Sequence, residues 1–365
     1  MAKPLVVYVL GAGFSRPLGL PLVHDFIRTA RDLYRENPAV LPHFSTVFDR
    51  LDSLAPIQNH LHANHLNIEE VLSTMEMEDA LRETEVSQDV RRFIADVVQL
   101  RTPPLPQRRS DPDQPITQMY ADSGWARYVG FLEGIFGARS SMSANEVVEY
   151  DAFGLAQTSY GIVTLNYDCV LETATEILRR HANNVVPSFA RSLGRQGIDP
   201  NRPSLAKLHG CASEPWSIVP MTWNKTIKTE IQSEWRLAFQ LLLNASEVRF
   251  IGYSLPAGDA YVRYLLKAAL RSNRSLRQID VITLDSDGET LDRYAKLISL
   301  PFSRRVVGTA QSYLDSMEHA TRSPNNGAGQ HPRRVRLADN LEGAHAFALD
   351  QLEAVLRRGT RDLSR

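Results

Sequence analysis

The sequence predicts an α/β protein built on a doubly wound parallel sheet, and two features of its pattern predict this class. Residues 5–10 (LVVYVL) are continuously apolar and rich in β-branched residues, as expected of a strand covered on both faces. After residue 158, short apolar runs alternate with segments whose apolar residues recur at helical spacing. Strands that alternate with helices in this way are typical of a parallel sheet with helices on both faces.

The second half of the chain supplies most of the predicted elements. Strands are predicted over residues 160–165, 205–208, 248–252 and 279–284. Helices are predicted over residues 170–180, 260–269 and 289–298. The first strand is followed by a loop over residues 11–21 and then by helical spacing up to Tyr34, so the chain begins with strand, loop and helix.

The domain organisation predicted from these elements has three parts. Residues 1–39 and 151–322 form the sheet domain, and residues 40–150 form a mostly helical insertion without a convincing strand. Within the insertion, residues 102–115 are rich in proline and charge and predict an exposed loop. Residues 323–365 form a linker and a C-terminal helical tail, with amphipathic spacing over 337–358.

The bulk composition excludes several classes of function. With a net charge of −1, the chain lacks the charge of a strong nucleic-acid binder. The N-terminal apolar run is too short for a signal peptide or a membrane span, so a cytoplasmic protein is expected. The two cysteines, Cys169 and Cys211, form no CxxC pair. This excludes a cysteine-cluster zinc site, and no metal site is predicted.

The first candidate site is the glycine loop after the first strand. Gly11 and Gly13 would let the backbone approach a pyrophosphate, while a following helix would direct free N–H groups at the anion. Ala12 and Ser15 belong to the same loop, and Arg16 occupies the place of the third glycine in GxGxxG. The alternative is a plain strand-to-helix turn.

The second candidate site is the segment TLNYD at residues 164–168. In an open α/β sheet, ligands bind at the carboxyl ends of the strands, where Thr164, Asn166 and Asp168 are predicted to lie. Asn166 could hydrogen-bond a ribose hydroxyl or orient a water molecule. The alternative is that Asn166 and Asp168 only cap the helix that begins near Val170.

Three further strand ends carry polar or glycine residues. His209 in KLHG could act as a general base, although a lone histidine is more often structural. Gly252 and Ser254 follow the next strand, and Asp259 after them is predicted to be a helix cap. Asp285 follows the strand after that and could accept a hydrogen bond from a ribose hydroxyl. All these clusters are predicted at one edge of one sheet, which favours a shared dinucleotide site.

Taken in order along the chain, these motifs resemble the sirtuin-like domains found in bacteria. The resemblance rests on GAGFSRPLGLP (11–21), TLNYD (164–168), KLHG (207–210) and GYSLP (252–256), and HLNIEEVL (65–72) resembles a stretch of the bacterial branch. It covers roughly residues 5–300. It implies the sirtuin NAD⁺-binding fold, which is Rossmann-like.

The resemblance also implies roles for individual residues. Gly11, Ala12, Gly13 and Ser15 would bind the NAD⁺ phosphates, and Arg16, Thr164 and Asp285 are further residues expected to bind NAD⁺. Asn166 and Asp168 would match the sirtuin TQNxD motif beside the nicotinamide ribose, and His209 the catalytic histidine. Gly252 and Ser254 would lie near the adenosine.

Two departures from the sirtuin pattern shape the expected function. The chain lacks the two CxxC pairs that bind structural zinc in sirtuin deacylases, and GLPLVHD (19–25) replaces the segment GIPDFR. Both departures fit the zinc-free bacterial branch, many of whose members resemble NAD⁺ hydrolases that act in antiphage defence. The resemblance therefore implies a hydrolase with NAD⁺ as substrate and no zinc, acting as a homo-oligomer or beside a HerA-type ATPase or a short Argonaute.

Other functions stay open at this point. An NAD⁺-dependent deacylase or ADP-ribosyltransferase would need a protein acceptor, and a non-catalytic sensor would bind NAD⁺ or ADP-ribose without cleaving it. A structural subunit could also retain the fold as a scaffold.

Overall fold

A computed structural model describes most of the chain. The described residues are 3–61, 67–105, 124–142, 148–151, 158–181, 186–195, 197–220, 229–298, 302–320 and 341–362. Most of the predicted proline-rich loop and the whole predicted linker over residues 323–333 lie outside them.

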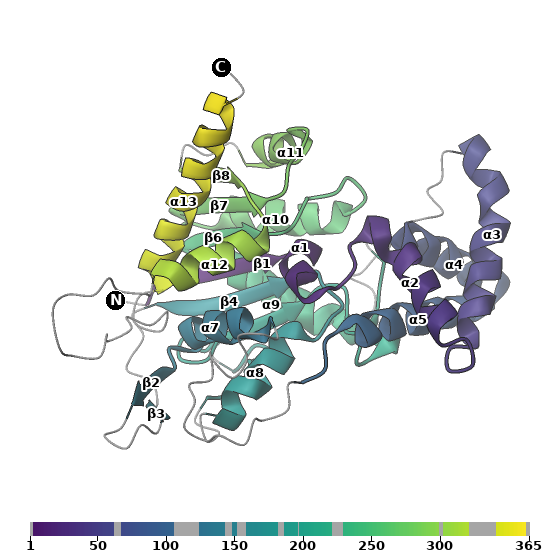
Figure 1. The fold of residues 1–365 in the computed structure, drawn as a ribbon, viewed down its shortest axis with the longest axis horizontal. Helices are drawn as coiled ribbons and strands as arrows, with labels where there is room; N and C mark the ends of the chain where they lie inside the picture. Colours follow the sequence, from purple (N-terminus) through teal and green to yellow (C-terminus); the bar gives the residue numbers. More distant parts are fainter. Residues whose placement is uncertain are drawn as a thin grey trace.

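The core is a six-stranded sheet in which every neighbouring pair of strands is parallel, as the sequence predicts (Figure 1). Its strands are β1 (Leu5–Leu10), β4 (Ser159–Thr164), β5 (Ser204–Lys207), β6 (Glu247–Ile251), β7 (Gln278–Thr283) and β8 (Ser303–Val307). In space they follow the order β5-β4-β1-β6-β7-β8. The order reverses beside β1, as in Rossmann-type folds, which bind dinucleotides at this switch point.

Strand β8 was not predicted, because its sequence SRRVV has no continuous apolar run. It is the outermost strand and only partly buried, so it needs fewer apolar residues than a central strand. The other strands agree with the predicted ranges to within one residue at most ends.

Helices cover both faces of the sheet because the side chains of each strand alternate between them. Val6, Tyr8 and Leu10 of β1 pack in one hydrophobic cluster, and Leu5 and Val7 pack in the other. The first face is covered by α7 (Trp125–Phe136), α8 (Val170–His181), α12 (Ala310–Ala320) and α13 (Leu341–Asp362). The second is covered by α9 (Thr229–Asn244), α10 (Ala260–Ser272) and α11 (Glu289–Leu297).

Four further helices form a block beyond the carboxyl ends of the strands (Figure 1). This helical block consists of α2 (Phe26–Glu36), α3 (His43–Leu61), α4 (Ile68–Arg82) and α5 (Val86–Arg101). Phe26 of α2 and Phe44 of α3 pack on Phe93 of α5, and all three belong to the cluster that also contains Tyr8 of β1. The block and the sheet therefore share one core.

The predicted absence of strands from residues 40–150 is wrong. β2 (Arg139–Met142) and β3 (Val148–Asp151) form a short antiparallel pair. Their sequences are brief and polar, so they carry little strand signal. Helix α7, which precedes them, packs on the sheet, with Phe131 edge-on to Tyr8 at 5.1 Å between ring centroids.

The loop after β1 is itself helical. Residues Ala12–Ser15 form α1 and Arg16–Leu18 form a 3-10 turn. The long helix predicted after the loop begins only at Phe26. Gly11 is therefore the N-cap of a single helical turn that starts directly at the end of β1.

The C-terminal helix α13 is anchored to the sheet by buried charge. Arg249 of β6, almost fully buried, donates to the Glu342 carboxylate, and Tyr160 of β4 donates to the same carboxylate at 2.9 Å. Arg249 also donates to Tyr8 at 2.8 Å. These bonds link the tail to three neighbouring strands.

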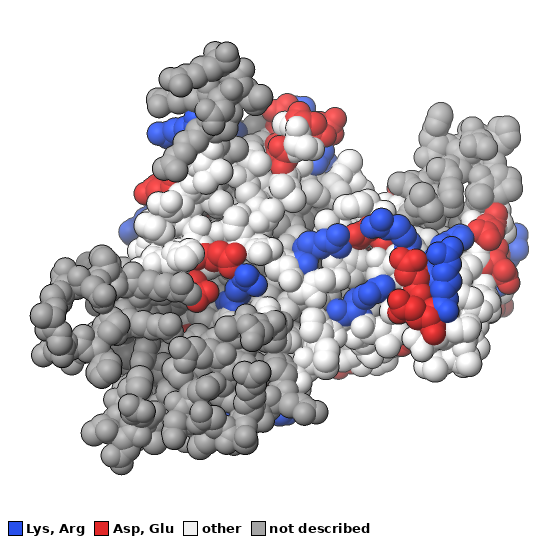
Figure 2. Space-filling view, in the orientation of Figure 1, with Lys and Arg blue, Asp and Glu red and all other residues white. Residues whose placement is uncertain are grey.

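Two surface properties bear on function. Basic and acidic side chains lie side by side over the helical block, and much of the described surface above the sheet is uncharged in this view (Figure 2). No helix among the described residues is long and apolar enough to cross a membrane.

Candidate active site

The loops after β1 and β6 meet at the switch point of the sheet. A Cβ on Gly252 would lie 2.6 Å from the backbone of Gly13 and Phe14, and one on Gly11 would lie 2.6 Å from the Gly252 carbonyl oxygen. The Gly13 amide donates to that carbonyl oxygen at 3.0 Å. The three glycines thus allow two loops to pack backbone against backbone, a requirement that exists without any ligand.

Asn166 is held tightly against this glycine loop. Its Nδ2 donates to the Gly11 carbonyl oxygen and to Ser15 Oγ, each at 3.0 Å. Because the Gly11 carbonyl can only accept, the nitrogen must face it and the oxygen must face away. The side chain is 7% exposed, and its Oδ1 has no hydrogen-bond partner among the described residues. A buried acceptor without a partner is costly unless something fills it.

Ser15 connects Asn166 to Asp168. Ser15 is buried, and it accepts from Asn166 and hydrogen-bonds the Asp168 carboxylate. Burial raises the pKa of Asp168, while Lys207 and the bond from Ser15 act in the opposite direction. Asp168 Oδ1 also accepts from the Val170 amide at 3.0 Å, so the predicted cap of α8 is present in addition to the contact with the glycine loop.

His209 lies at the end of β5 beside an acidic residue. It is fully buried, and its Nε2 lies 3.6 Å from Asp259 Oδ2, slightly beyond hydrogen-bond length. Tyr253 donates to the same Asp259 oxygen at 2.8 Å. Asp259 was predicted only as a helix cap, but its side chain makes no capping bond to α10. The sequence carried no signal for its pairing with His209, because 50 residues separate them along the chain.

Tyr167 links His209 to the helical block. Its ring centroid lies 6.0 Å from that of His209. Burial raises the pKa of Tyr167 well above its usual value, and the negative charge of the nearby Glu69 of α4 raises it further. Glu69 is buried and lies two residues after Asn67, the N-cap of α4. The helical block therefore contributes an acidic side chain to the site.

A second link to the block holds the loop after His209. The Ala212 amide donates to the Tyr167 carbonyl at 2.7 Å, and Gln99 of α5 donates to the Ala212 carbonyl at 2.5 Å. Helix α5 also contacts the 3-10 turn at Pro215–Ser217. The loops after β4 and β5 are thereby joined to each other and to α5.

Lys207 is a buried cation directly beneath these loops. Its ammonium donates to the Asp168 carbonyl and to Glu172 Oε1, the latter at 3.1 Å. Burial lowers the pKa of Lys207, but Glu172 and the neighbouring cysteines raise it more, so it is charged at neutral pH.

Three predicted binding residues are engaged elsewhere. Arg16 is half-exposed and forms an ion pair with the buried Asp25 at 2.7 Å. Both carboxylate oxygens of Asp285 accept from backbone amides at the start of α11. Ser254 is exposed, and its carbonyl accepts from Arg293. The residues that the structure brings together are Gly11, Gly13, Ser15, Asn166, Asp168 and Gly252, with His209 joined to them through Tyr167.

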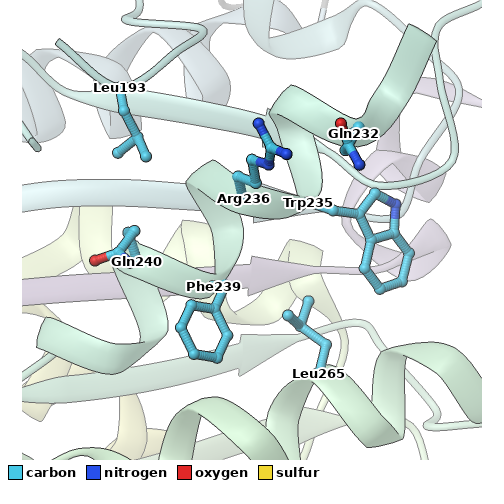
Figure 3. A pocket seen from close by; sticks show the side chains of 7 residues that line it. All are labelled: Leu193, Gln232, Trp235, Arg236, Phe239, Gln240 and Leu265. Atoms are coloured by element: carbon cyan, nitrogen blue, oxygen red, sulfur yellow. The ribbon is translucent and has the colours of Figure 1, made fainter. Parts of the chain in front are cut away.

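A separate pocket opens between α9 and α10 (Figure 3). It has a volume of about 380 Å³ and is lined by Leu193, Gln232, Trp235, Arg236, Phe239, Gln240 and Leu265. The one ionisable side chain among these lining residues is Arg236. Because arginine stays charged, it is not suited to act as an acid or a base. Its Trp235 donates to the Leu208 carbonyl at 3.1 Å, so the pocket wall supports the strand end that carries His209.

Within the described part of the chain, no group of three or more His, Cys, Asp or Glu side chains could hold a metal ion. The site is instead made of amide, carboxylate, imidazole and hydroxyl groups. Such groups can bind a sugar and transfer a proton.

Comparison with known proteins gives one family match. Residues 161–300 match a family model described as the SIR2-like domain. This range includes Asn166, Asp168, His209, Gly252 and Asp259, and it excludes the glycine loop after β1. No curated protein matches the chain.

Proposed function

We propose, from the premise of a SIR2-like domain over residues 161–300, that this chain is an NAD⁺ hydrolase. It would cleave the bond between nicotinamide and ribose and release nicotinamide and ADP-ribose. NAD⁺ is the substrate of this reaction, and the chemistry needs no zinc.

The observation that carries the proposal is the unfilled acceptor of Asn166. Its Oδ1 is buried at the switch point of a Rossmann-type sheet, where such folds bind dinucleotides. The two bonds from Nδ2 hold the amide in place, so the oxygen is pre-oriented to accept from a ribose hydroxyl or from the attacking water. Either bond would replace the partner that the buried oxygen lacks.

His209 is the proposed general base. As the C–N bond breaks, its electron pair passes to the cationic nicotinamide ring, and an oxocarbenium-like centre develops on the ribose. A water oxygen then bonds to that carbon while the imidazole accepts a proton from the water. Asp259, held by Tyr253, lies where it would stabilise the resulting imidazolium.

The enclosure of His209 sets a condition on this mechanism. Because the imidazole is fully buried, water can reach it only when neighbouring side chains move. Tyr167 lies beside it and is joined to the helical block through Glu69. We infer that displacement of the block relative to the sheet opens the site, which would allow an assembly or a partner to control the activity.

The proposal is tested by incubating the purified chain with NAD⁺ and measuring nicotinamide release. Replacing Asn166 or His209 by alanine is expected to lower the rate at least about 100-fold, the usual contribution of a general base or of precise positioning. Asn244→Ala and His319→Ala are matched controls, because both residues are exposed and lie on outer helices. Wild-type rates in the first two variants would refute the assignment.

The same assay separates the alternatives. A deacylase or ADP-ribosyltransferase would release nicotinamide only when an acetylated peptide or a protein acceptor is added. A sensor would retain NAD⁺ intact after long incubation. Release by the chain without an acceptor supports hydrolysis.

The wider role proposed is that of an antiphage effector, and it is supported by the bacterial sirtuin-like resemblance alone. An unregulated NAD⁺ hydrolase would harm its host, so we propose control through a homo-oligomer or a partner such as a HerA-type ATPase or a short Argonaute. Adding proteins encoded beside this chain to the assay tests that control.

For the domain organisation, we propose a sheet domain over residues 1–39 and 151–322, an insertion over 40–150 and a tail over 323–365. Two helices make contacts across these borders. Helix α2 packs with the block through Phe26, and α7 packs on the sheet through Phe131.

A further inference from the structure

Cys169 and Cys211 are the only cysteines of the chain, and they lie in contact. Their sulfur atoms are 3.2 Å apart, although 42 residues separate them in sequence. Cys169 follows Asp168 in the loop after β4, and Cys211 lies two residues after His209 in the loop after β5. The hydrogen bond between Ala212 and Tyr167 holds these loops together next to the pair.

The surroundings favour reaction at one sulfur of the pair. Cys211 Sγ lies 3.1 Å from Ser213 Oγ, and the buried ammonium of Lys207 lies close enough to act on both thiols. The hydrogen bond between the two sulfurs lowers the pKa of Cys211 to about 5 and raises the pKa of Cys169. A thiolate is the reactive form of cysteine, and a neighbouring thiol can then resolve the oxidised product.

We propose that Cys169 and Cys211 form a peroxide-reactive dithiol that a hydroperoxide converts into an intramolecular disulfide. The Cys211 thiolate attacks one peroxide oxygen, the O–O bond breaks, and Cys211 becomes a sulfenic acid. The departing oxygen takes up a proton and leaves as water or an alcohol. The Cys169 sulfur then attacks Cys211 Sγ, the S–O bond breaks, and hydroxide leaves as water with the Cys169 proton. The two thiols lose two electrons in total, and the peroxide gains them.

The geometry requires only a small movement. A disulfide has an S–S distance of about 2.05 Å, so the sulfurs must approach by roughly 1 Å. Cys169 is partly exposed and Cys211 is 8% exposed, which gives a small peroxide a route to the pair. This oxidation does not depend on the proposed NAD⁺ cleavage.

The test uses the reduced full-length protein, hydrogen peroxide at low excess, a thiol-alkylating reagent and intact mass measurement. The expected product is a monomer that is two hydrogen atoms lighter, takes up no alkylating reagent and recovers both thiols after reduction. If both cysteines still alkylate after exposure, or if the disulfide joins two chains, the proposal is wrong.

Two matched variants test the assignment of roles. Cys169→Ser is expected to stop at the sulfenic acid on Cys211, which a dimedone probe captures. Cys211→Ser is expected to react at least about tenfold more slowly, because it removes the attacking sulfur and leaves Cys169, whose pKa is still raised by burial. Equal rates in the two variants would overturn the assignment of Cys211 as the attacking sulfur. Circular dichroism confirms that both variants are folded.

Discussion

Among the described residues, two buried histidines lie beside aspartates, in two different regions of the fold. One region is the strand-end site, the loops that carry Asn166 and His209. The other is the tail face, where α12 and α13 cover β6 and β7. In the tail face, His345 Nε2 lies 2.9 Å from Asp280, and Nδ1 lies 2.8 Å from the Tyr313 hydroxyl. In the strand-end site, the imidazole of His209 is 3.6 Å from its aspartate.

The difference separates a structural histidine from the one proposed as general base. Both ring nitrogens of His345 have partners at hydrogen-bond length, so the ring is locked and its bonds stabilise the packing of the tail. In the strand-end site the imidazole lies farther from its aspartate, and the amide oxygen of Asn166 has no hydrogen-bond partner among the described residues. Both histidines are buried, and the two regions differ in the distance between imidazole and aspartate and in the buried amide oxygen of Asn166.

The largest expected effect comes from the glycines of the two regions. Gly252→Ala would place a Cβ 2.6 Å from the backbone of Gly13 and Phe14, at a φ of +63°. We expect it to lower the free energy of unfolding by about 3 kcal/mol or more, because neither backbone can yield and the left-handed conformation adds strain. Chemical denaturation measures this loss.

Gly308→Ala in the tail face is the matched control for that change. Its Cβ would meet the end of the Leu352 side chain at 3.0 Å, and this side chain can rotate. We expect a loss of less than about 1 kcal/mol. Equal losses at the two positions would show that the contact between the glycine loops is no more rigid than the packing of the tail.

The two aspartates provide the next contrast. Asp259→Asn is expected to reduce nicotinamide release at least about tenfold and to shift the pH profile of kcat, because Asp259 is proposed to position His209. Asp280→Asn is expected to lower the free energy of unfolding by about 1–3 kcal/mol, because it weakens a buried bond, and to leave the rate unchanged. Kinetics and chemical denaturation of both variants test this contrast. If Asp280→Asn lowered the rate and Asp259→Asn did not, the roles assigned to the two histidines would be reversed.

The smallest effect concerns pH. Burial lowers the pKa of His345 below its usual 6.5, with Arg249 acting in the same direction. As the pH falls, the unfolded chain therefore binds the proton before the folded protein does. The contribution of His345 to the free energy of unfolding is complete above pH 6.5 and is lost below it, by at most about 1.4 kcal/mol per pH unit. Denaturation between about pH 8 and pH 5 should show a smaller loss in His345→Gln than in the wild type. A loss of equal size in both proteins would contradict the assignment.

Asp168 gives the opposite sign in the strand-end site. Burial raises the pKa of Asp168 above 3.8. Its contribution to the free energy of unfolding is therefore present below pH 3.8 and is lost as the pH rises through the pKa of Asp168 in the folded protein.

Much of the fold could be predicted from the sequence because central parallel strands are apolar on both faces and give continuous runs. The polar edge strand β8 and the pair β2–β3 gave no such signal. For the site, the motifs predicted Asn166, Asp168 and His209 at one sheet edge. Asp259 could not be found, because its proximity to His209 arises only when the loops after β5 and β6 converge.

The close contact between the two glycine loops could not be predicted from the sequence either. Gly11 and Gly13 were predicted to make room for a phosphate. In the structure, a side chain at either position would also clash with the backbone of Gly252. A glycine pattern in the sequence indicates that some group approaches the backbone closely. The folded structure is needed to show which group it is.

The bond between Arg249 and Glu342 has a consequence for the synthesis of the protein. The two residues are 93 positions apart, and the guanidinium lies in a central strand of the sheet. While the chain emerges from the ribosome, the strands can pair well before residue 342 is available. Until then the only carboxylate that Arg249 contacts among the described residues is Glu247 of its own strand, 2.7 Å away, and the face that α13 covers stays open to water. The burial of Arg249 is therefore completed only when α13 packs on the sheet, which makes the tail a late step in the assembly of the fold.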